Sequence, residues 1–519
     1  MNVTHKKSSS IAVVTIFSIL APISGLALEL ILAAYYGSSN SIDGFRTSYL
    51  LINFGLQVFG VTLISLLVAM FAEQNIKTNL QDAWSQIFTI GFYLSPILLM
   101  FIGLVLLFPS HIVDFLGPGL RDNGGFESAK SLMKYTSSAL FFMLWSSIFN
   151  SLLHSSKVFW VSSIVLLLPS LLPIIFIVQE TKYFDIGPLG RGILSGYMIT
   201  TVILFIGIYK LSMHNGMSLL RHIRIFSFAY FLLYLKRFAP VAFIIIISQI
   251  GAIELYRVLS TLGSGTLALT GYAWKLIAIL SILPVSISTV IMPSLSTMYF
   301  SDNKIKLNLL LTKSTRMVIF LSIPLCIFVF IEQYNIVTLF FGHTFEGELL
   351  TQIARIFGAL VIGIPAATTI MPLSKIALVM NDKFSMLSFP LCISVGTILF
   401  SSTAVEIGGD YALIIMFSLL TWFGAIVQML YQSIAYKLIN LQELVLYFFK
   451  ITTLLLLPLS FVFLMKFNFN MAPILDLFVS GSIFLILFIS ISLRFKIVEC
   501  NLLVDFFYRM VRLILLRKS

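Results

Sequence analysis

The residues of this chain most able to do chemistry are two charged side chains inside long apolar runs, Glu29 and Lys275. A charge within the hydrocarbon of a membrane costs at least about 2.5–3.5 kcal/mol, so it usually faces a bundle interior or a wet cavity. We expect both side chains to face one central cavity from opposite halves of the chain. The alternatives are a neutral buried acid at Glu29 and a lysine at 275 whose ammonium extends to the membrane surface.

Four further polar residues extend this candidate site. Asp43 and Arg46 lie where the second apolar run begins, at its predicted outer mouth. Asn53 and Gln57 lie within that run, one helical turn apart and therefore on one face of a helix. With Glu29 and Lys275, these four residues form the predicted substrate-binding set.

Motifs for enzyme chemistry are missing from the sequence. It contains no Gly-Lys dipeptide and hence no P-loop, and no HExxH, DxD or CxxC motif. The three cysteines are far apart and have no metal-ligand spacing. A membrane transferase would need clustered acids on a sizeable loop, for which the nearest candidates are Asp114, Asp122 and Glu127. We expect a transporter rather than an enzyme, with no catalytic residue, metal or cofactor.

The composition explains why a membrane is the expected solvent. Of the 519 residues, 59% are hydrophobic and only 10% are charged, against about 25% charged in an ordinary soluble domain. The mean hydropathy is +1.02. A water-soluble globule of this composition would expose more apolar surface than water tolerates, so a soluble enzyme is excluded.

The apolar runs predict an all-α, polytopic membrane protein. A spanning helix needs about 20 mostly apolar residues. By that measure the sequence holds about fourteen candidates, at 11–36, 48–71, 86–108, 135–153, 158–178, 189–209, 238–258, 265–299, 317–331, 354–374, 385–405, 411–435, 447–465 and 473–493.

The basic residues predict the orientation. If the N-terminus is cytoplasmic and the spans alternate, 23 of the 33 Lys and Arg residues fall inside and nine outside, with Lys275 in a span. Cytoplasmic loops collect Lys and Arg. The net charge of +12 therefore indicates topology rather than nucleic-acid binding. We expect a multi-pass protein of the bacterial cytoplasmic (inner) membrane with both termini in the cytoplasm.

A short internal repeat predicts two related lobes. The sequence IKTNL at 76–80 follows the second span, and IKLNL at 305–309 follows the eighth. Six spans per half would relate the halves by an axis along the membrane normal. The expected divisions are an N-terminal six-helix lobe at 1–215, a C-terminal six-helix lobe at 216–440, two extra transmembrane helices at 441–493 and a basic amphipathic cytoplasmic tail at 494–519.

Two stretches resemble the MviN/MurJ family of lipid-linked oligosaccharide flippases, within the multidrug/oligosaccharidyl-lipid/polysaccharide exporter superfamily. The first is the pattern GxxxExxxAxxxGxxxxxDxF at 25–45, followed by Asn53. The second holds Gly263-Ser264-Gly265, Tyr272-Ala273-Trp274-Lys275-Leu276 and Met292-Pro293-Ser294-Leu295-Ser296 in the family's order. The resemblance runs to about residue 400.

The resemblance implies a V-shaped pair of six-helix lobes around a cationic cavity for a polyprenyl pyrophosphate head group. Two extra helices would form a groove for the lipid tail. At positions where this family has arginines, the chain has Leu28, Leu56 and Gln57, and an Asp-Arg pair is replaced by Trp274-Lys275. A cavity with fewer cations should bind a pyrophosphate more weakly, or bind another polyprenyl-linked glycan.

These observations predict a flippase that moves a polyprenyl-pyrophosphate-linked saccharide, lipid II-like or a related glycan, across the membrane by alternating access. The drive would be the membrane potential or a coupled H⁺ or Na⁺. Glu29 is the candidate for coupling and Lys275 for head-group contact. The expected partners are the saccharide lipid and membrane lipids, with no nucleic acid. The alternatives are a polysaccharide/O-antigen exporter, a drug/cation antiporter of the same superfamily, or a non-transporting scaffold in envelope assembly.

Overall fold

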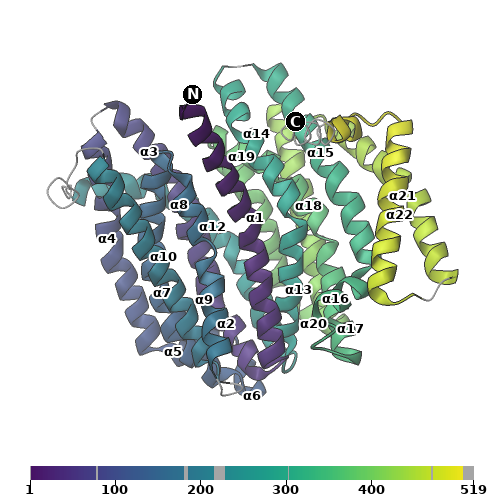
Figure 1. Ribbon diagram of the computed structural model, residues 1–519, viewed down its shortest axis with the longest axis horizontal. Coiled ribbons are helices and arrows are strands. Elements are labelled where there is room, and N and C mark those ends of the chain that lie inside the picture. The colour runs from purple at the N-terminus through teal and green to yellow at the C-terminus, as the bar shows by residue number, and fades with distance from the viewer. Residues whose placement is uncertain are drawn as a thin grey trace. The chain divides into compact units, whose positions relative to one another are not determined.

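The computed structural model describes residues 2–77, 80–180, 185–214, 228–301, 303–468 and 471–505, and their regular structure is helical throughout, with no strand (Figure 1). The predicted all-α fold class is confirmed. The packing groups the chain into two compact units, Met1–Lys275 and Leu276–Ser519. The lobe boundary predicted near residue 215 from the repeat stays a prediction, as do the divisions at 441 and 494.

The first unit is assembled around α7, a long helix rich in serine. Its Ser137 and Ser147 hydroxyls donate to carbonyl oxygens one turn back, so these polar groups are satisfied inside the helix. Small side chains let neighbouring helices approach closely, and α2, α4 and α10 pack against α7. The helices of this unit are α1 (Asn2–Tyr36), α2 (Asn40–Gly55), η1 (Leu56–Leu63, with wider π-helical turns), α3 (Ile64–Lys77), α4 (Leu80–Leu107), α5 (Pro109–Leu116), α6 (Leu120–Asn123), α7 (Phe126–Ser155), α8 (Phe159–Val165), α9 (Leu168–Gln179), α10 (Gly187–His214), α12 (Phe228–Thr261) and the beginning of α13 (Thr266–Leu280).

The second unit is built on α15, whose buried face packs against α14, α18 and α21. Its apolar core includes Leu311, Phe320, Ile451 and Phe488. At the C-terminal end of the unit, α21 and α22 lie side by side (Figure 1). The helices are α14 (Ile282–Phe300), α15 (Lys304–Ile331), α16 (Gln333–Phe341), α17 (Gly347–Val361), α18 (Ile364–Thr369), α19 (Met371–Met380), α20 (Lys383–Tyr436), α21 (Leu441–Asn468) and α22 (Pro473–Arg494), followed by a helical segment at 498–505.

Each of the fourteen predicted spans falls on one helix or on two or three successive helices. Within the described ranges, eleven helices are long and apolar enough to cross a membrane, and twelve if α13 and α14, bent by 52°, count as one span. The two remaining predicted spans correspond to the Leu20–Tyr36 part of α1 and to the division of α20 into two halves. The over-long 265–299 run is the bent pair, which explains its length.

The division of α20 lies at a Gly-Gly pair. Gly408 has φ −166° and ψ 31°, and Gly409 has φ 61° and ψ −140°, so the helix reverses there. The two halves then pack against each other as an antiparallel hairpin, in which Gly396 meets Leu420 and Gly424 meets Phe389. The hairpin therefore requires a residue at 409 that tolerates positive φ, and glycine does so without steric cost.

Replacing Gly409 by Ala should lower the free energy of unfolding by about 1–3 kcal/mol, because this φ/ψ combination is accessible essentially to glycine alone. No atom lies within 4 Å of the position of an added Cβ, so backbone strain is the only cost. Gly408→Ala is the matched control and should cost less, since its φ is extended. Unfolding in mixed detergent micelles measures both, and equal losses would contradict this account.

Candidate functional site

The centre of the candidate site is a buried ion pair between Glu29 on α1 and Arg46 on α2. Arg46 Nη1 donates to Glu29 Oε1 at 3.0 Å and Nη2 donates to Oε2 at 2.5 Å. Both side chains are less than a tenth exposed. This two-bond geometry is the strongest form of carboxylate–guanidinium contact, and it neutralises both charges where hydration is poor.

Aromatic and glycine residues complete the surroundings of Arg46. The guanidinium carbon lies 5.2 Å from the ring centre of Tyr272 and 5.4 Å from that of Phe45, within the range of cation–π attraction. Gly271 on α13 lies so close to Arg46 that an added Cβ would overlap the Nε atom of Arg46. The close approach of α13 to the guanidinium therefore depends on the absence of a side chain at 271.

Asp43 fixes the beginning of α13 against α2. Its two carboxylate oxygens accept hydrogen bonds from the backbone N–H groups of Gly265 at 2.6 Å and Ala268 at 2.8 Å. Free N–H groups at a helix N-terminus favour an anionic partner. The Tyr272 hydroxyl adds a bond to the carbonyl oxygen of Gly37, at 2.6 Å. Asp43 is 2% exposed, which makes it a buried helix cap.

Lys275 lies one turn beyond Gly271 on α13, and its side chain packs against α1 at Gly25. An added Cβ on Gly25 would lie 2.7 Å from Lys275 Cε and 2.9 Å from Nζ. Gly25 is one turn before Glu29, so the ammonium lies about one helical turn from the ion pair. Within the described part of the chain, Lys275 has no ion-pair partner. It is the cation of this cluster left with an unused charge.

The predicted site residues thus divide into two groups. Glu29, Asp43, Arg46 and Lys275 come together within the first unit, whereas Asn53 is half-buried and Gln57 is exposed further along α2 and η1. The bond between Arg46 and Glu29 was not predicted, and the neutral-acid alternative for Glu29 stays open. That these residues bind substrate, and that a cavity between the two halves receives it, stay predictions.

Two of the three acids considered for an enzyme, Asp114 and Glu127, are paired with neighbouring basic residues. Arg121 Nε donates to Asp114 Oδ1 at 2.6 Å, and this bond holds the pKa of the Asp114 carboxyl below its usual range. Glu127 lies 3.6 Å from Lys130. These are exposed ion pairs on the loop side of α5 and α7, of a kind that contributes little to stability.

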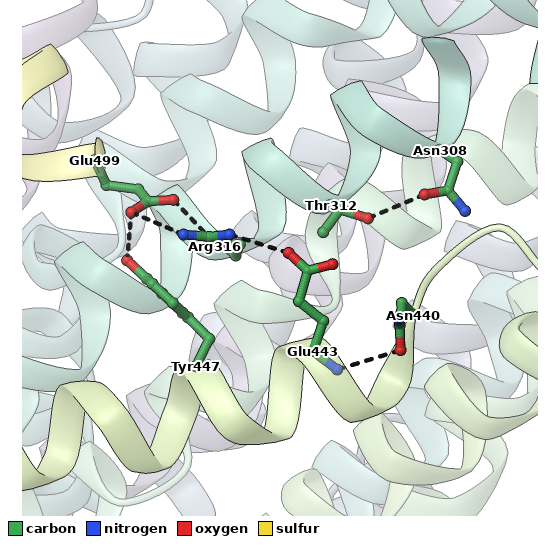
Figure 2. Close-up of polar contacts among 7 residues, drawn as sticks. All are labelled: Asn308, Thr312, Arg316, Asn440, Glu443, Tyr447 and Glu499. Carbon is green, nitrogen blue, oxygen red and sulfur yellow. Dashed lines mark hydrogen bonds and ion pairs between the residues drawn. The ribbon is translucent and has the colours of Figure 1, made fainter. Parts of the chain in front are cut away.

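A second charged cluster ties the C-terminal helices to α15 (Figure 2). Arg316 on α15 donates to Glu443 on α21 at 3.0 Å, and its Nε lies 2.9 Å from a carboxylate oxygen of Glu499. The Tyr447 hydroxyl donates to Glu499 at 2.9 Å, and the guanidinium lies 4.4 Å from the Tyr447 ring centre. Glu499 and the adjacent Cys500 are 4% and 2% exposed. The first turns after α22 therefore dock on protein; residues 506–519 of the predicted tail lie outside the described residues.

A third cluster anchors the opposite end of the α21–α22 pair. Lys466 Nζ lies 2.9 Å from Glu332 and 3.6 Å from Asp476. The Asn335 amide donates to both carboxylates, at 2.7 and 2.8 Å. Glu332 is fully buried, and this lysine and amide both contact its Oε2 oxygen, which supplies a counter-charge and a hydrogen bond to a buried carboxylate. Polar clusters at both ends hold the pair against α15 and α16.

Packed apolar helices with charges neutralised inside the bundle define a polytopic membrane protein, the class to which helical transporters belong. The family model described as lipid II flippase MurJ matches residues 32–376, about two-thirds of the chain. The chain therefore belongs to the MurJ family, in the multidrug/oligosaccharidyl-lipid/polysaccharide exporter superfamily, and the predicted resemblance is confirmed.

Individual relatives agree with this assignment. A probable lipid II flippase MurJ of Buchnera aphidicola subsp. Baizongia pistaciae is 24% identical over 356 residues, 66% of this chain and 67% of that protein. The lipid II flippase MurJ of Burkholderia cenocepacia is 22% identical over 369 residues, 67% of this chain and 68% of that protein. The matches span about two-thirds of the length of these relatives.

Solved structures agree on the fold. A lipid II flippase MurJ in an inward closed conformation superposes with a TM-score of 0.77 at 22% identity, covering 93% of this chain and 98% of that one. An inward-facing MATE family multidrug transporter gives 0.63 at 15% identity, covering 80% and 94%. At these identities the comparison establishes the architecture alone.

Glu29→Gln should destabilise the protein by about 3–5 kcal/mol, because it leaves the buried Arg46 guanidinium without a counter-charge. The double variant Glu29→Gln/Arg46→Met should recover most of that loss. The free energies of unfolding of the two single variants and the double variant form the test. A Glu29→Gln variant as stable as the wild type would show that the pair is not buried as described.

Glu499→Ala should release the segment that follows α22, since it removes the acceptor shared by Arg316 and Tyr447. We expect Cys500 to react with a maleimide about tenfold or more faster, the rate change that corresponds to one lost charge-assisted bond. Cys326, buried in α15, is the internal control and should stay protected. Unchanged Cys500 reactivity would mean that apolar packing alone holds the segment.

Proposed function

We propose that the protein is a flippase that moves a polyprenyl-pyrophosphate-linked saccharide from the inner to the outer leaflet of the cytoplasmic membrane by alternating access. Membership of the MurJ family supports this function, as does the MurJ name of its relatives. The proposed substrate is lipid II or a closely related lipid-linked glycan. Both termini would lie in the cytoplasm, as the distribution of basic residues predicts.

The observation that carries the proposal is the unequal use of the two cations near Glu29. Arg46 forms two hydrogen bonds to the Glu29 carboxylate, which neutralises its charge. Lys275 lies about one helical turn from this ion pair and has no ion-pair partner within the described residues. A pyrophosphate that leaves water needs a positive charge to replace its hydration. Lys275 is placed to supply that charge, with the Glu29–Arg46 pair holding α1 and α2 in register beside it.

The character of this cation limits how tightly the substrate is held. A lysine ammonium is a compact point charge, whereas an arginine donates two parallel bonds to a phosphate. The site therefore binds the head group weakly, through a single contact from the flexible Lys275 side chain. Weak holding suits a carrier that must release its substrate on the other side, and it makes the sugar portion a larger share of recognition.

Energy for the cycle would come from the membrane potential or from a coupled H⁺ or Na⁺. Moving one elementary charge through 100 mV is worth about 2.3 kcal/mol, enough to bias an alternating-access cycle. Glu29 is the candidate coupling residue. Because Arg46 occupies both of its oxygens, an ion or proton would bind there only in a state in which that pair opens.

Lys275→Ala should reduce flipping about tenfold to a hundredfold, the effect of one lost hydrogen bond to a charged group. The readout is rescue of cells depleted of their lipid II flippase, together with the amount of lipid-linked saccharide left in the inner leaflet. Lys275→Arg should retain most activity. Lys313→Ala, an exposed lysine of α15, is the matched control.

Wild-type rescue by Lys275→Ala would remove Lys275 from the mechanism. If the unaltered protein fails to rescue these cells but restores another lipid-linked glycan pathway, the substrate is that glycan and not lipid II.

A further inference from the structure

The hairpin made by the two halves of α20 contains an apolar groove unrelated to the Glu29–Lys275 cluster. Its volume is about 1120 Å³, and its lining is apolar apart from Thr403, the Tyr411 hydroxyl and backbone. Several large apolar side chains that line it are exposed, among them Leu399 at 64%, Phe423 at 57% and Val395 at 45%. An apolar hollow of this size in a membrane-spanning helix pair is a site for hydrocarbon.

The length of the groove fits a lipid chain. It follows the first half of α20 from Leu391 to Ile407, which at 1.5 Å per residue is about 24 Å. The hydrocarbon core of a bilayer is about 30 Å thick. A single extended acyl chain could therefore lie along the groove for its whole length.

A polar pocket begins where the groove ends. Its volume is about 510 Å³, and it is lined by residues 347–356 of α17, by Tyr334 of α16, and by Asp410 and Tyr411 at the turn of α20. Tyr411 lines both the groove and the pocket. The two hollows therefore form one amphipathic site, with the polar end at the Gly408–Gly409 turn on the predicted outer side of the membrane.

The charged residues of the polar pocket differ in their hydrogen bonds and ion pairs. Asp410 accepts hydrogen bonds from Gln352 at 2.9 Å and from the backbone N–H of Tyr411 at 2.8 Å. Arg355 and Glu348 are exposed and have no ion-pair partner in the described ranges. They lie seven residues apart on α17, hence on one face and about 10.5 Å apart along the helix. The pocket therefore holds one cation, Arg355, and two carboxylates, of which Asp410 is hydrogen-bonded by neutral groups and Glu348 has no ion-pair partner in the described ranges.

We propose that this site binds a zwitterionic aminophospholipid of the outer leaflet, with one acyl chain in the α20 groove. Arg355 would bind the phosphate through paired N–H donors, and Glu348 would accept the head-group ammonium. The two carboxylates of the pocket, Glu348 and Asp410, disfavour a lipid whose head group is purely anionic. The bound lipid would fill the hairpin and fix its distance from α17.

The test is photolabelling of the full-length protein in nanodiscs with a phosphatidylethanolamine that carries a diazirine in one acyl chain. We expect adducts on α20 peptides, reduced at least fivefold by Val395→Trp, which fills the groove, and by Arg355→Ala, which removes the phosphate partner. Ile398→Trp is the control for the first variant, since Ile398 is exposed on the same helix but does not line the groove. Lys383→Ala, at the other end of the first half of α20, is the control for the second.

Competition identifies the head group. Unlabelled phosphatidylethanolamine should displace the probe, whereas phosphatidylglycerol and a polyprenyl phosphate should displace it at least fivefold less well. Equal labelling of Val395→Trp and Ile398→Trp would overturn the site. Equal competition by phosphatidylglycerol, or stronger competition by the polyprenyl phosphate, would overturn the assignment of the ligand. Melting curves in detergent confirm that each variant is folded before it is scored.

Discussion

The architecture of the first unit depends on the neutralisation of Arg46 by Glu29. An isolated guanidinium inside a helix bundle would cost several kcal/mol, and an isolated carboxylate likewise. Because each supplies the counter-charge of the other, α1 and α2 can place their charged faces together away from water. The same arrangement brings Gly271 against the guanidinium and so determines how closely α13 approaches. Asp43 then holds the first turn of α13, and Lys275 follows on the same helix.

The second unit uses the same principle for a different purpose. Arg316 with Glu443 and Glu499 at one end of the α21–α22 pair, and Lys466 with Glu332 and Asp476 at the other, satisfy buried or half-buried charges in small networks. These networks fasten the pair to α15 and α16. Lys275 in the first unit and Arg355 with Glu348 in the second have no ion-pair partner among the described residues, and these are the charges that we assign to ligands. The Lys275 site and the Arg355–Glu348 pocket thus share one physical feature, a charged side chain without an ion-pair partner beside a helix interface or an apolar groove.

Much of the fold could be predicted because hydropathy alone determines which segments can cross a bilayer. The runs at 385–405 and 411–435 are separated in the sequence by a Gly-Gly pair, and the structure reverses there. The ion pair was harder to predict, although a signal was present: Glu29 lies eight residues before Gly37 and Arg46 six residues after Asn40. In an antiparallel pair of helices these positions are at similar heights, so opposite charges there should meet. The sequence holds no comparable signal that Glu499 is buried. Its partners, Tyr447 and Arg316, lie 52 and 183 residues away in the sequence, and only the packing of the helices brings them together.

The central claim is that the positive charge at residue 275 is what the substrate pathway requires, and chemical rescue tests it most directly. In a chain whose native cysteines are replaced, Lys275→Cys should flip about tenfold to a hundredfold more slowly, as expected for Lys275→Ala. Modification with a 2-aminoethyl methanethiosulfonate rebuilds a cationic side chain of similar length and should restore transport. The anionic sulfonatoethyl reagent of similar size should not. Equal effects of the two reagents, or a cysteine at 275 that neither reagent reaches, would contradict the account.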